Sequence, residues 1–201
     1  MKIKTVILGS LAILSVGGYL LFSQQSIPSK IKPTPLSNQE VKAELEVYPF
    51  DQAVLKSDLI VRVKIKDKVG LIDGPIPKTT FEANVEEIIT DKSNKSPKTV
   101  KIMQQGSEQV NFNGNELFKK NEEVILFLMQ AKTVENAYWI LGEETNIYKV
   151  LENEVTKYSL KDKQLEDITK NSYLNDKKDR EFQVMDREKF IEKIKSYKTN
   201  K

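Results

Sequence analysis

The chain has 201 residues, of which 39 % are apolar and 30 % are charged, and its formal net charge is +3. This balance is typical of a folded domain with a core, and the near-neutral charge gives no electrostatic reason to expect a nucleic-acid partner. No cysteine or histidine is present, which excludes disulfide bonds, Cys/His zinc sites, thiol nucleophiles and Ser-His-Asp catalysis.

Residues 1–23 are predicted to form an N-terminal transmembrane helix. Residues 6–22 are apolar apart from small side chains, and Lys2 and Lys4 precede them. A helix of this length spans about 25 Å, the lower end of what crosses a hydrocarbon core of about 30 Å. The two lysines favour an N-in, C-out orientation in the cell membrane, with residues 6–22 in contact with lipid.

A signal peptide is the alternative to this anchor. Residues 16–18 resemble the small-residue end of a signal sequence, and cleavage near Gly18 would release a secreted protein. The mature chain would then begin with the apolar residues 19–22, which favours the uncleaved anchor over the signal peptide and over a third interpretation, a buried core helix. Residues 24–37 contain three prolines and are predicted to form an extended linker before an extracytoplasmic domain, residues 38–201.

The domain is predicted to begin with a short helix and several strands. Residues 50–57 fit a helix with Asp51 as its N-cap. Over residues 58–69 and 79–90, apolar and polar side chains alternate as in half-buried strands, with one apolar face formed by Leu59, Val61, Val63 and Ile65, and the other by Phe81, Ala83, Val85 and Ile89. Further strands are predicted at residues 99–106, 122–129, 137–141, 146–151 and 155–160, the last two as a hairpin across residues 152–154.

Residues 122–129 are the most apolar run of the domain and predict a strand covered on both faces. Residues 70–77 and 161–181 are predicted to be loops. Residues 185–198 fit a helix with Asp186 as N-cap and an apolar face of Phe190, Ile194 and Tyr197. Seven short strands, two helices and no βαβ alternation predict a mainly β (α+β) fold, a small antiparallel β-barrel or sandwich with a C-terminal helix.

On several stretches the chain resembles a group of uncharacterised exported or membrane-anchored proteins of Gram-positive bacteria that carry an OB-like or netrin-like β-barrel domain. These stretches are residues 56–65, 81–89, 98–106, 117–129 and 188–198. The resemblance covers about residues 48–198 and implies a barrel fold but no particular chemistry. In that group the second strand runs into Lys-Gly, whereas here residues 90–92 follow.

Three aromatic residues, Tyr138, Trp139 and Tyr148, are the candidate ligand-binding residues. Aromatic side chains on OB-like surfaces can line a groove for an extended ligand. On short strands they more often pack in the core and across strands.

Two pairs of carboxylates are candidates for catalytic groups, since a glycosidase needs two carboxyl groups on either side of a cleft. Glu82 and Glu86 lie on the predicted solvent face of their strand, where Lys64 or Lys101 could pair with them, and residues 143–144 lie at a strand end. Neither pair predicts a catalytic site.

Residues 111–116, with the sequence NFNGNE, are similar to a calcium loop but contain no aspartate. An Asn-Gly turn with positive φ angles explains them better. Glycine-rich phosphate loops are absent, so the sequence predicts no metal, no cofactor and no catalytic residue.

These observations favour a binding or accessory module of the bacterial cell envelope over an enzyme. Its partner would be the membrane together with an unknown envelope protein or wall polymer. Two alternatives stay open: an envelope hydrolase that uses carboxylate or Ser/Lys chemistry, and a stress, immunity or sporulation factor that acts by sequestration.

N-terminal sequencing of the mature protein distinguishes the anchor from the signal peptide. We expect the membrane-extracted chain to begin at Met1, because cleavage would leave an exposed apolar end. A chain that begins at Tyr19 would show cleavage after Gly18 and contradict the anchor.

Overall fold

The computed structural model describes residues 39–44, 46–132, 134, 136–157, 161–175 and 180–198. The predicted transmembrane helix and linker lie outside these residues. Within the described ranges, no helix has the length and apolar character needed to cross a bilayer.

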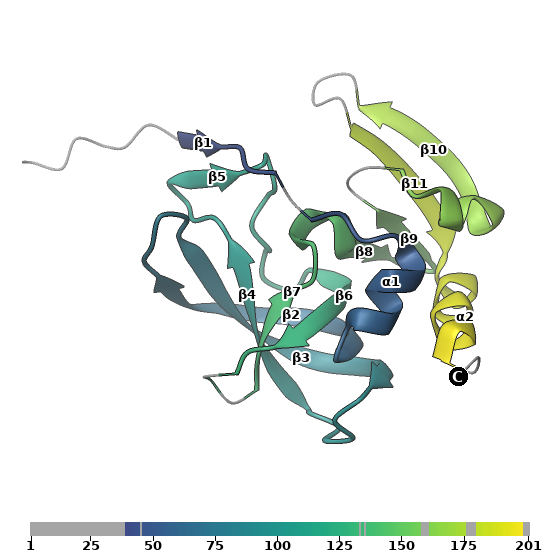
Figure 1. The fold of residues 1–201 in the computed structure, drawn as a ribbon, viewed down its shortest axis with the longest axis horizontal. Coiled ribbons are helices and arrows are strands. Elements are labelled where there is room, and N and C mark those ends of the chain that lie inside the picture. Colours follow the sequence, from purple (N-terminus) through teal and green to yellow (C-terminus); the bar gives the residue numbers. More distant parts are fainter. Residues whose placement is uncertain are drawn as a thin grey trace, which may run out of the picture. The chain divides into compact units, whose positions relative to one another are not determined.

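Strands dominate the described part of the chain (Figure 1). Two α-helices and two short 3₁₀ helices, η1 and η2, accompany them. In chain order the elements are β1 (Gln39–Val41), α1 (Phe50–Lys56), β2 (Leu59–Ile72), β3 (Lys78–Asp91), β4 (Thr99–Gln105), β5 (Val110–Phe112), β6 (Glu123–Gln130), β7 (Ala137–Ile140), η1 (Glu143–Asn146), β8 (Ile147–Leu151), β9 (Glu154–Lys157), η2 (Lys163–Ile168), β10 (Thr169–Asn175), β11 (Arg180–Asp186) and α2 (Arg187–Lys198).

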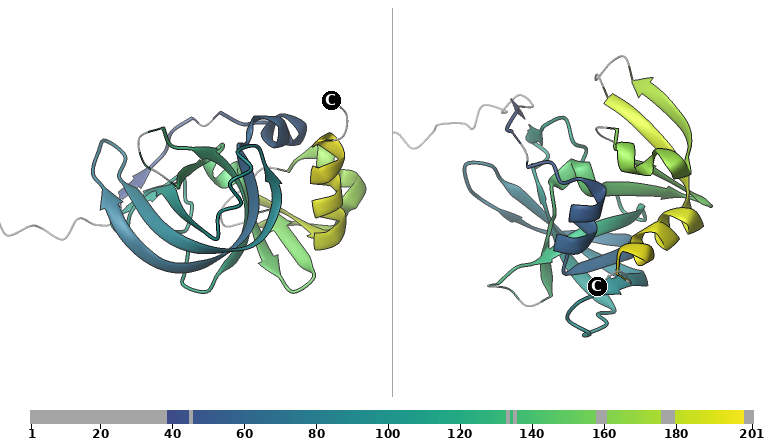
Figure 2. Two further views of the ribbon diagram at one scale, coloured as in Figure 1. Left: turned by 90° about the horizontal axis from the view of Figure 1, so that it is seen from below. Right: turned by 45° about the vertical axis from the view of Figure 1, so that its right-hand side comes forward.

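Five strands close into a barrel. β2, β3 and β4 form an antiparallel meander, and β4 pairs in parallel with β7. β6 closes the barrel because it pairs antiparallel with both β7 and β2. The long, curved strands β2 and β3 wrap around the barrel in the left view of Figure 2. The predicted mainly β fold with a barrel and a C-terminal helix is therefore confirmed. The barrel is not wholly antiparallel as predicted, because β4 and β7 pair in parallel.

β6 also carries a second sheet. One edge of β6 pairs with β2, whereas the other edge pairs with β7 near its C-terminal end and with β8 near its N-terminal end. From β8 the antiparallel order continues through β9 and β11 to β10. The barrel and the second sheet are thus continuous through one strand.

β6 is covered on both faces, as its sequence predicted, and it separates two apolar cores. Val124, Leu126 and Leu128 point into the barrel, while Ile125 and Phe127 point to the other side, and all five are fully buried. The second core lies between the sheet and the two α-helices and is rich in aromatic rings. Its members include Phe50 of α1, Phe127, Tyr148 of β8 and Phe190 of α2, with neighbouring ring centroids 4.5 to 6.5 Å apart.

The C-terminal helix matches its prediction. The Asp186 carboxylate accepts hydrogen bonds from the N–H groups of Glu188 (3.0 Å) and Lys189 (3.2 Å), which is the bonding pattern of an N-cap. Phe190 and Ile194 are fully buried, and Tyr197 packs against the same core.

The first helix departs from its prediction at its N-cap. Pro49 is the N-cap of α1, and Asp51 lies in the first turn, where its carboxylate accepts a hydrogen bond from Gln164 Nε2 at 3.1 Å. Leu55 is exposed. Phe50, Ala53 and Val54 form the buried face.

The alternation in β3 is interrupted by a β-bulge. Val63 pairs with Val85 but Arg62 pairs with Glu87, so Glu86 is an extra residue on β3. One extra residue inverts the faces of the side chains that follow it, here up to the next register shift between Ile88 and Thr90. Ile89, predicted on the face of Phe81, therefore lies in the second core.

The prediction of a loop at residues 161–181 was wrong. Residues 163–168 form η2, and β10 pairs with β11 as an antiparallel hairpin that extends the second sheet. The predicted loop at residues 70–77 is shorter than expected, because β2 continues to Ile72. The predicted hairpin across residues 152–154 is confirmed by the antiparallel pairing of β8 with β9.

We expect Phe127→Ala to lower the free energy of unfolding by about 3–5 kcal/mol, since it removes a fully buried ring and leaves a cavity. The matched control is Met129→Ala, on the same strand and face but 41 % exposed, which should cost less than about 1 kcal/mol. Urea unfolding of both variants checks the difference. Equal losses would contradict the two-core arrangement.

Candidate functional site

The outer surface of β4 and β7, where the barrel closes, carries a mixed aromatic and charged face. Val100 and Ile102 of β4, like Tyr138 and Ile140 of β7, point into the barrel. Alternation leaves the intervening residues outside, and the parallel register sets Lys101 beside Ala137 and Met103 beside Trp139. We call this surface, with the adjoining side chains of β3, the β4–β7 face. It comprises Lys78 and Glu82 of β3, Lys101 and Trp139, and the buried Met103 and Ala137 against which Trp139 packs.

Trp139 is the aromatic centre of the β4–β7 face. Its half-buried ring packs against a small cluster of Met103, Ala131 and Ala137. The Lys78 ammonium group lies 5.6 Å from the ring centroid, within the range of a cation–π contact. The ring is thus held by packing and by a contact with a cation.

A polar cavity of about 370 Å³ lies at one end of the β4–β7 face. Its lining comes from β3, β4 and the β6–β7 connection: Glu82, Thr99, Val100, Lys101, Val134 and Asn136. The connection is held in place because the Lys101 N–H donates to the Asn136 carbonyl at 2.8 Å. Glu82 pairs with Lys66 at 3.1 Å, so a carboxylate and two ammonium groups surround this end.

The other end of the β4–β7 face adjoins a buried carboxylate, Glu143. Ile140 of β7 pairs with Leu128 of β6, and Ile147 of β8 pairs with Leu126. β7 and β8 thus follow the same edge of β6, and η1 is an excursion between them. The excursion buries four consecutive polar side chains, those of Glu143, Glu144, Thr145 and Asn146.

Two residues in the left-handed conformation allow this excursion. Gly142 has φ 67° and Glu143 has φ 47°. A Cβ atom at Gly142 would lie 2.6 Å from Thr145 Oγ1 and 2.9 Å from Asn146 Nδ2, so the turn requires glycine. Glu143 is therefore held in a strained conformation by its surroundings, as is common at functional sites.

The environment of Glu143 favours its neutral form. Burial raises the pKa of Glu143 to about 8, and the neighbouring charge of Glu144 contributes to the rise. A hydrogen bond from the Gln105 N–H to Glu143 Oε2 (3.3 Å) and the positive charge of Lys78 oppose this shift but do not cancel it. The Lys78 ammonium group thus lies near the Trp139 ring, and its positive charge also acts to lower the pKa of Glu143.

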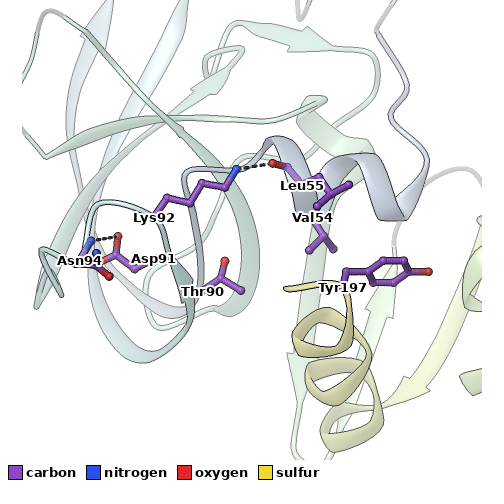
Figure 3. A pocket seen from close by; sticks show the side chains of 7 residues that line it. All are labelled: Val54, Leu55, Thr90, Asp91, Lys92, Asn94 and Tyr197. Carbon is purple, nitrogen blue, oxygen red and sulfur yellow. Dashed lines mark hydrogen bonds between the residues drawn. The ribbon is translucent and has the colours of Figure 1, made fainter. Parts of the chain in front are cut away.

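A second cavity, of about 310 Å³, lies between α1, the β3–β4 turn and α2 (Figure 3). Its apolar wall is formed by Val54, Leu55 and Tyr197. The Lys92 ammonium group donates to the Leu55 carbonyl at the C-terminal end of α1, where a positive charge complements the helix dipole. This cavity combines an apolar wall with polar groups that hold the turn.

Asp91 organises the turn at the edge of that cavity. Its carboxylate accepts hydrogen bonds from the N–H groups of Ser93, Asn94 and Ser96 and from the Ser93 hydroxyl, at 2.7 to 3.1 Å. Burial pushes the pKa of Asp91 upward, but these hydrogen bonds outweigh it and hold the pKa below its ordinary value. The Asp91 carboxylate therefore has a structural role, because its hydrogen bonds hold the turn.

The three aromatic candidates do not share a surface. Tyr138 is 3 % exposed and lies in the barrel core, whereas Tyr148 is fully buried in the second core. Trp139 alone of the three lies on the outer surface of the barrel. For the two tyrosines, the packing interpretation that the sequence favoured is confirmed. A binding role for Trp139 stays a prediction.

The carboxylates that the sequence suggested also lie in different surroundings. Glu82 lies on the outer face of β3 as predicted, but it pairs with Lys66 rather than with Lys64 or Lys101. Glu86 is exposed at the bulge. Sequence reasoning missed the burial of Glu143. The signal available was a glycine followed by four polar residues between two apolar strands.

The described ranges contain no group of three or more acidic side chains gathered as in a metal site. No protein-family model matches the chain, and no curated protein matches it in sequence. The resemblance to exported Gram-positive proteins therefore stays a prediction. What the β4–β7 face could bind is inferred from its own side chains.

The raised pKa of Glu143 predicts that stability falls as the pH rises. Between the ordinary value of 4.5 and about 8, the folded chain holds a proton that the unfolded chain has released. The stabilisation is complete below pH 4.5 and is lost progressively up to pH 8. The loss is at most about 5 kcal/mol, because each pH unit in this window costs about 1.4 kcal/mol.

Glu143→Gln keeps a neutral side chain at every pH. We expect this variant to lose most of that pH dependence and to be more stable than the natural chain near pH 8, as measured by urea unfolding at several pH values. Glu86→Gln, at an exposed position, should leave the dependence unchanged. If the free energy of unfolding changes with pH by the same slope in Glu143→Gln and in the natural chain, the proton on Glu143 is not the source of the pH dependence.

Proposed function

We propose that the chain is a single-pass, membrane-anchored binding or accessory module of the bacterial cell envelope, with its barrel domain outside the cytoplasm. The observation that carries the proposal is the β4–β7 face, where a tryptophan ring, two lysines and a polar cavity lie together on a barrel. The barrel interior is filled with packed side chains. A ligand must therefore bind on the outside.

The strand order supports an OB-like barrel. Three meander strands followed by two strands that close the barrel through a parallel β4–β7 pair are the arrangement of that fold. OB-folds bind extended ligands across their second and third strands and the adjoining loops. Here those strands are β3 and β4, over which the cavity of Glu82 and Lys101 lies. An envelope protein or a wall polymer is the kind of extended ligand that suits this surface.

The proposed location rests on the sequence of the N-terminal segment. Residues 6–22 provide the apolar stretch, and Lys2 and Lys4 provide the positive charge on its leading side. The resemblance to exported Gram-positive proteins agrees with this location. Secretion after cleavage near Gly18 is the alternative, and it also leaves the barrel outside the cytoplasm.

One observation favours an envelope hydrolase as the second candidate. Glu143 has a pKa of about 8, and a carboxyl group that keeps its proton at neutral pH can act as a general acid. However, neither Glu143 nor Glu144 lines the cavity at the other end of the β4–β7 face. A glycosidase needs both carboxyl groups beside the substrate, and the binding module therefore accounts better for this arrangement.

Cross-linking of the tagged full-length chain in native membranes tests the proposal. We expect a reproducible partner whose recovery falls at least about tenfold in Trp139→Ser and in Lys101→Glu. Lys101 is exposed, so its substitution should leave folding intact. The control is Leu151→Ala on the β8–β9 hairpin, an exposed apolar residue away from this face, which should recover the same partner.

Two further measurements complete the test. Protease added to intact protoplasts should degrade the barrel domain; survival until the cells are lysed would contradict the proposed topology. The hydrolase would be the better account of the function under two conditions. No partner is recovered, and the purified chain turns over wall fragments with an activity that Glu143→Gln abolishes.

A further inference from the structure

The hairpin that joins β2 to β3 carries exposed apolar side chains at its tip, residues 69–77, which we call the β2–β3 tip. Val69, Leu71 and Ile72 are 48 %, 50 % and 44 % exposed. Eight large apolar side chains are exposed among the described residues, and these three lie within four consecutive positions. Apolar side chains exposed singly are common on soluble proteins, whereas a group of them marks a surface that contacts a partner or a membrane.

The β2–β3 tip reaches beyond the strand that closes the barrel. The pairing of β2 with β6 ends at Lys64, whereas its pairing with β3 continues to Ile72. Past Lys64, β2 is therefore an edge of the sheet within the described part of the chain. The end of the hairpin is the blue loop at the left of the barrel in Figure 1 and in both views of Figure 2.

Both faces of the β2–β3 tip are exposed. Leu71 and Ile72 follow each other in a stretch of β2 that pairs with β3 without a register shift. Successive side chains of a strand point to opposite faces, and both of these side chains are exposed. A flat protein partner would contact one face of the hairpin, whereas lipid surrounds a tip that enters a bilayer. Exposure on both faces therefore favours a membrane as the partner.

The base of the β2–β3 tip is held by hydrogen bonds to the chain that follows β4. The Gly106 N–H donates to the Pro77 carbonyl at 2.7 Å, and the Thr79 hydroxyl donates to the Gly106 carbonyl at 2.9 Å. Pro75 and Pro77 also restrict the backbone of the turn. The apolar side chains are thus presented on an ordered support, so little conformational entropy is lost when the tip binds.

The tip lies at the end of the barrel where the described chain begins. Lys68, which precedes the tip, pairs with Glu108 at 2.9 Å. Two residues after Glu108, Val110 of β5 pairs with Gln39 of β1. The tip and β1 therefore belong to the same end of the barrel, as Figure 1 shows.

The predicted membrane segment, residues 6–22, precedes β1 and gives the tip a bilayer within reach. Residues 23–38 join the two, and a chain of this length spans at most on the order of 50 Å. A contact of a few apolar side chains is too weak to bind from dilute solution. A tether makes this contact intramolecular, at an effective concentration in the millimolar range, so that a weak second attachment is sufficient.

We propose that the β2–β3 tip inserts into the bilayer that holds the predicted anchor, an inference that rests on the membrane location in the proposed function. Val69, Leu71 and Ile72 contact the boundary between the lipid headgroups and the acyl chains. Asp73 is the only charged residue of the tip, and its carboxylate must stay among the headgroups, because a charge is costly in hydrocarbon. The insertion is therefore shallow.

Tryptophan fluorescence of the full-length chain in vesicles tests the proposal. Trp139 is the only tryptophan of the chain, so Trp139→Phe provides a background without tryptophan emission. On this background Leu71→Trp reports on the tip, in vesicles of phosphatidylcholine and phosphatidylglycerol. Lipids brominated near the headgroup should quench its emission by about half or more, and lipids brominated deep in the acyl chains should quench it less.

The matched control is Leu55→Trp on the same background. Leu55 is also an exposed leucine, at 40 %. It contacts Lys92, next to Asp91, which pairs with Leu59 at the opposite end of the β2–β3 hairpin. Neither brominated lipid should quench its emission.

Two changes within the tip define the contact, each combined with Leu71→Trp. Val69→Ser together with Ile72→Ser should reduce the quenching by about twofold or more, because apolar side chains leave the bilayer. Asp73→Asn should increase the quenching by the deep bromines, because it removes the charge that limits insertion. These side chains are exposed, so urea unfolding should show little change in stability.

Flotation of the vesicles separates the tip from the anchor. A chain that floats, but in which Leu71→Trp is quenched no more than Leu55→Trp, overturns the insertion of the tip and leaves the anchor intact. A chain that does not float contradicts the anchor and the tip together. An unquenched Leu71→Trp, with loss of the cross-linked partner in the double serine variant, would show that the tip binds a protein and would also overturn the inference.

Discussion

The burial of β6 on both faces is the constraint on which the rest of the structure depends. Residues Val124 to Leu128 are fully buried and divide their side chains between the barrel and the helix-covered core. A slip of one residue would exchange the two sets and drive Phe127 into the barrel. The register of β2, β7 and β8 on this strand is therefore strongly determined, and with it the position of every surface feature that those strands carry.

The polar features lie where this framework is interrupted. β7 and β8 follow one edge of β6, and the residues between them leave that edge as a buried polar turn, which desolvates Glu143. The connection between β4 and β6 contains the predicted Asn-Gly turn, with φ angles of 50° at Asn113 and 67° at Gly114. Connections held by a rigid scaffold are where proteins commonly place binding groups, because the scaffold orients them in advance.

The sequence predicted elements well where one local pattern dominated. Alternation located β2 and β4, a continuous apolar run located β6, and helical spacing with an aspartate cap located α2. It failed for β10 and β11, whose segment is charged and lacks a clear alternating pattern. It also misplaced Ile89, because a bulge cannot be recognised from alternation alone. Alternation does separate Tyr138 from Trp139, but the burial of Tyr148 depends on the pairing of β8 with β6.

The amino-acid sequence by itself determined which chemistry is excluded, the types of most elements and the apolar face of most strands. These properties are local, since they depend on residue identity and on a period of two or 3.6 residues. The closure of β4 on β7, the buried proton of Glu143 and the exposure of Leu71 and Ile72 at the β2–β3 tip belong to the tertiary structure. Each depends on which distant segments meet, and burial and hydrogen-bond pairing are set by those non-local contacts rather than by the order of residues along the chain.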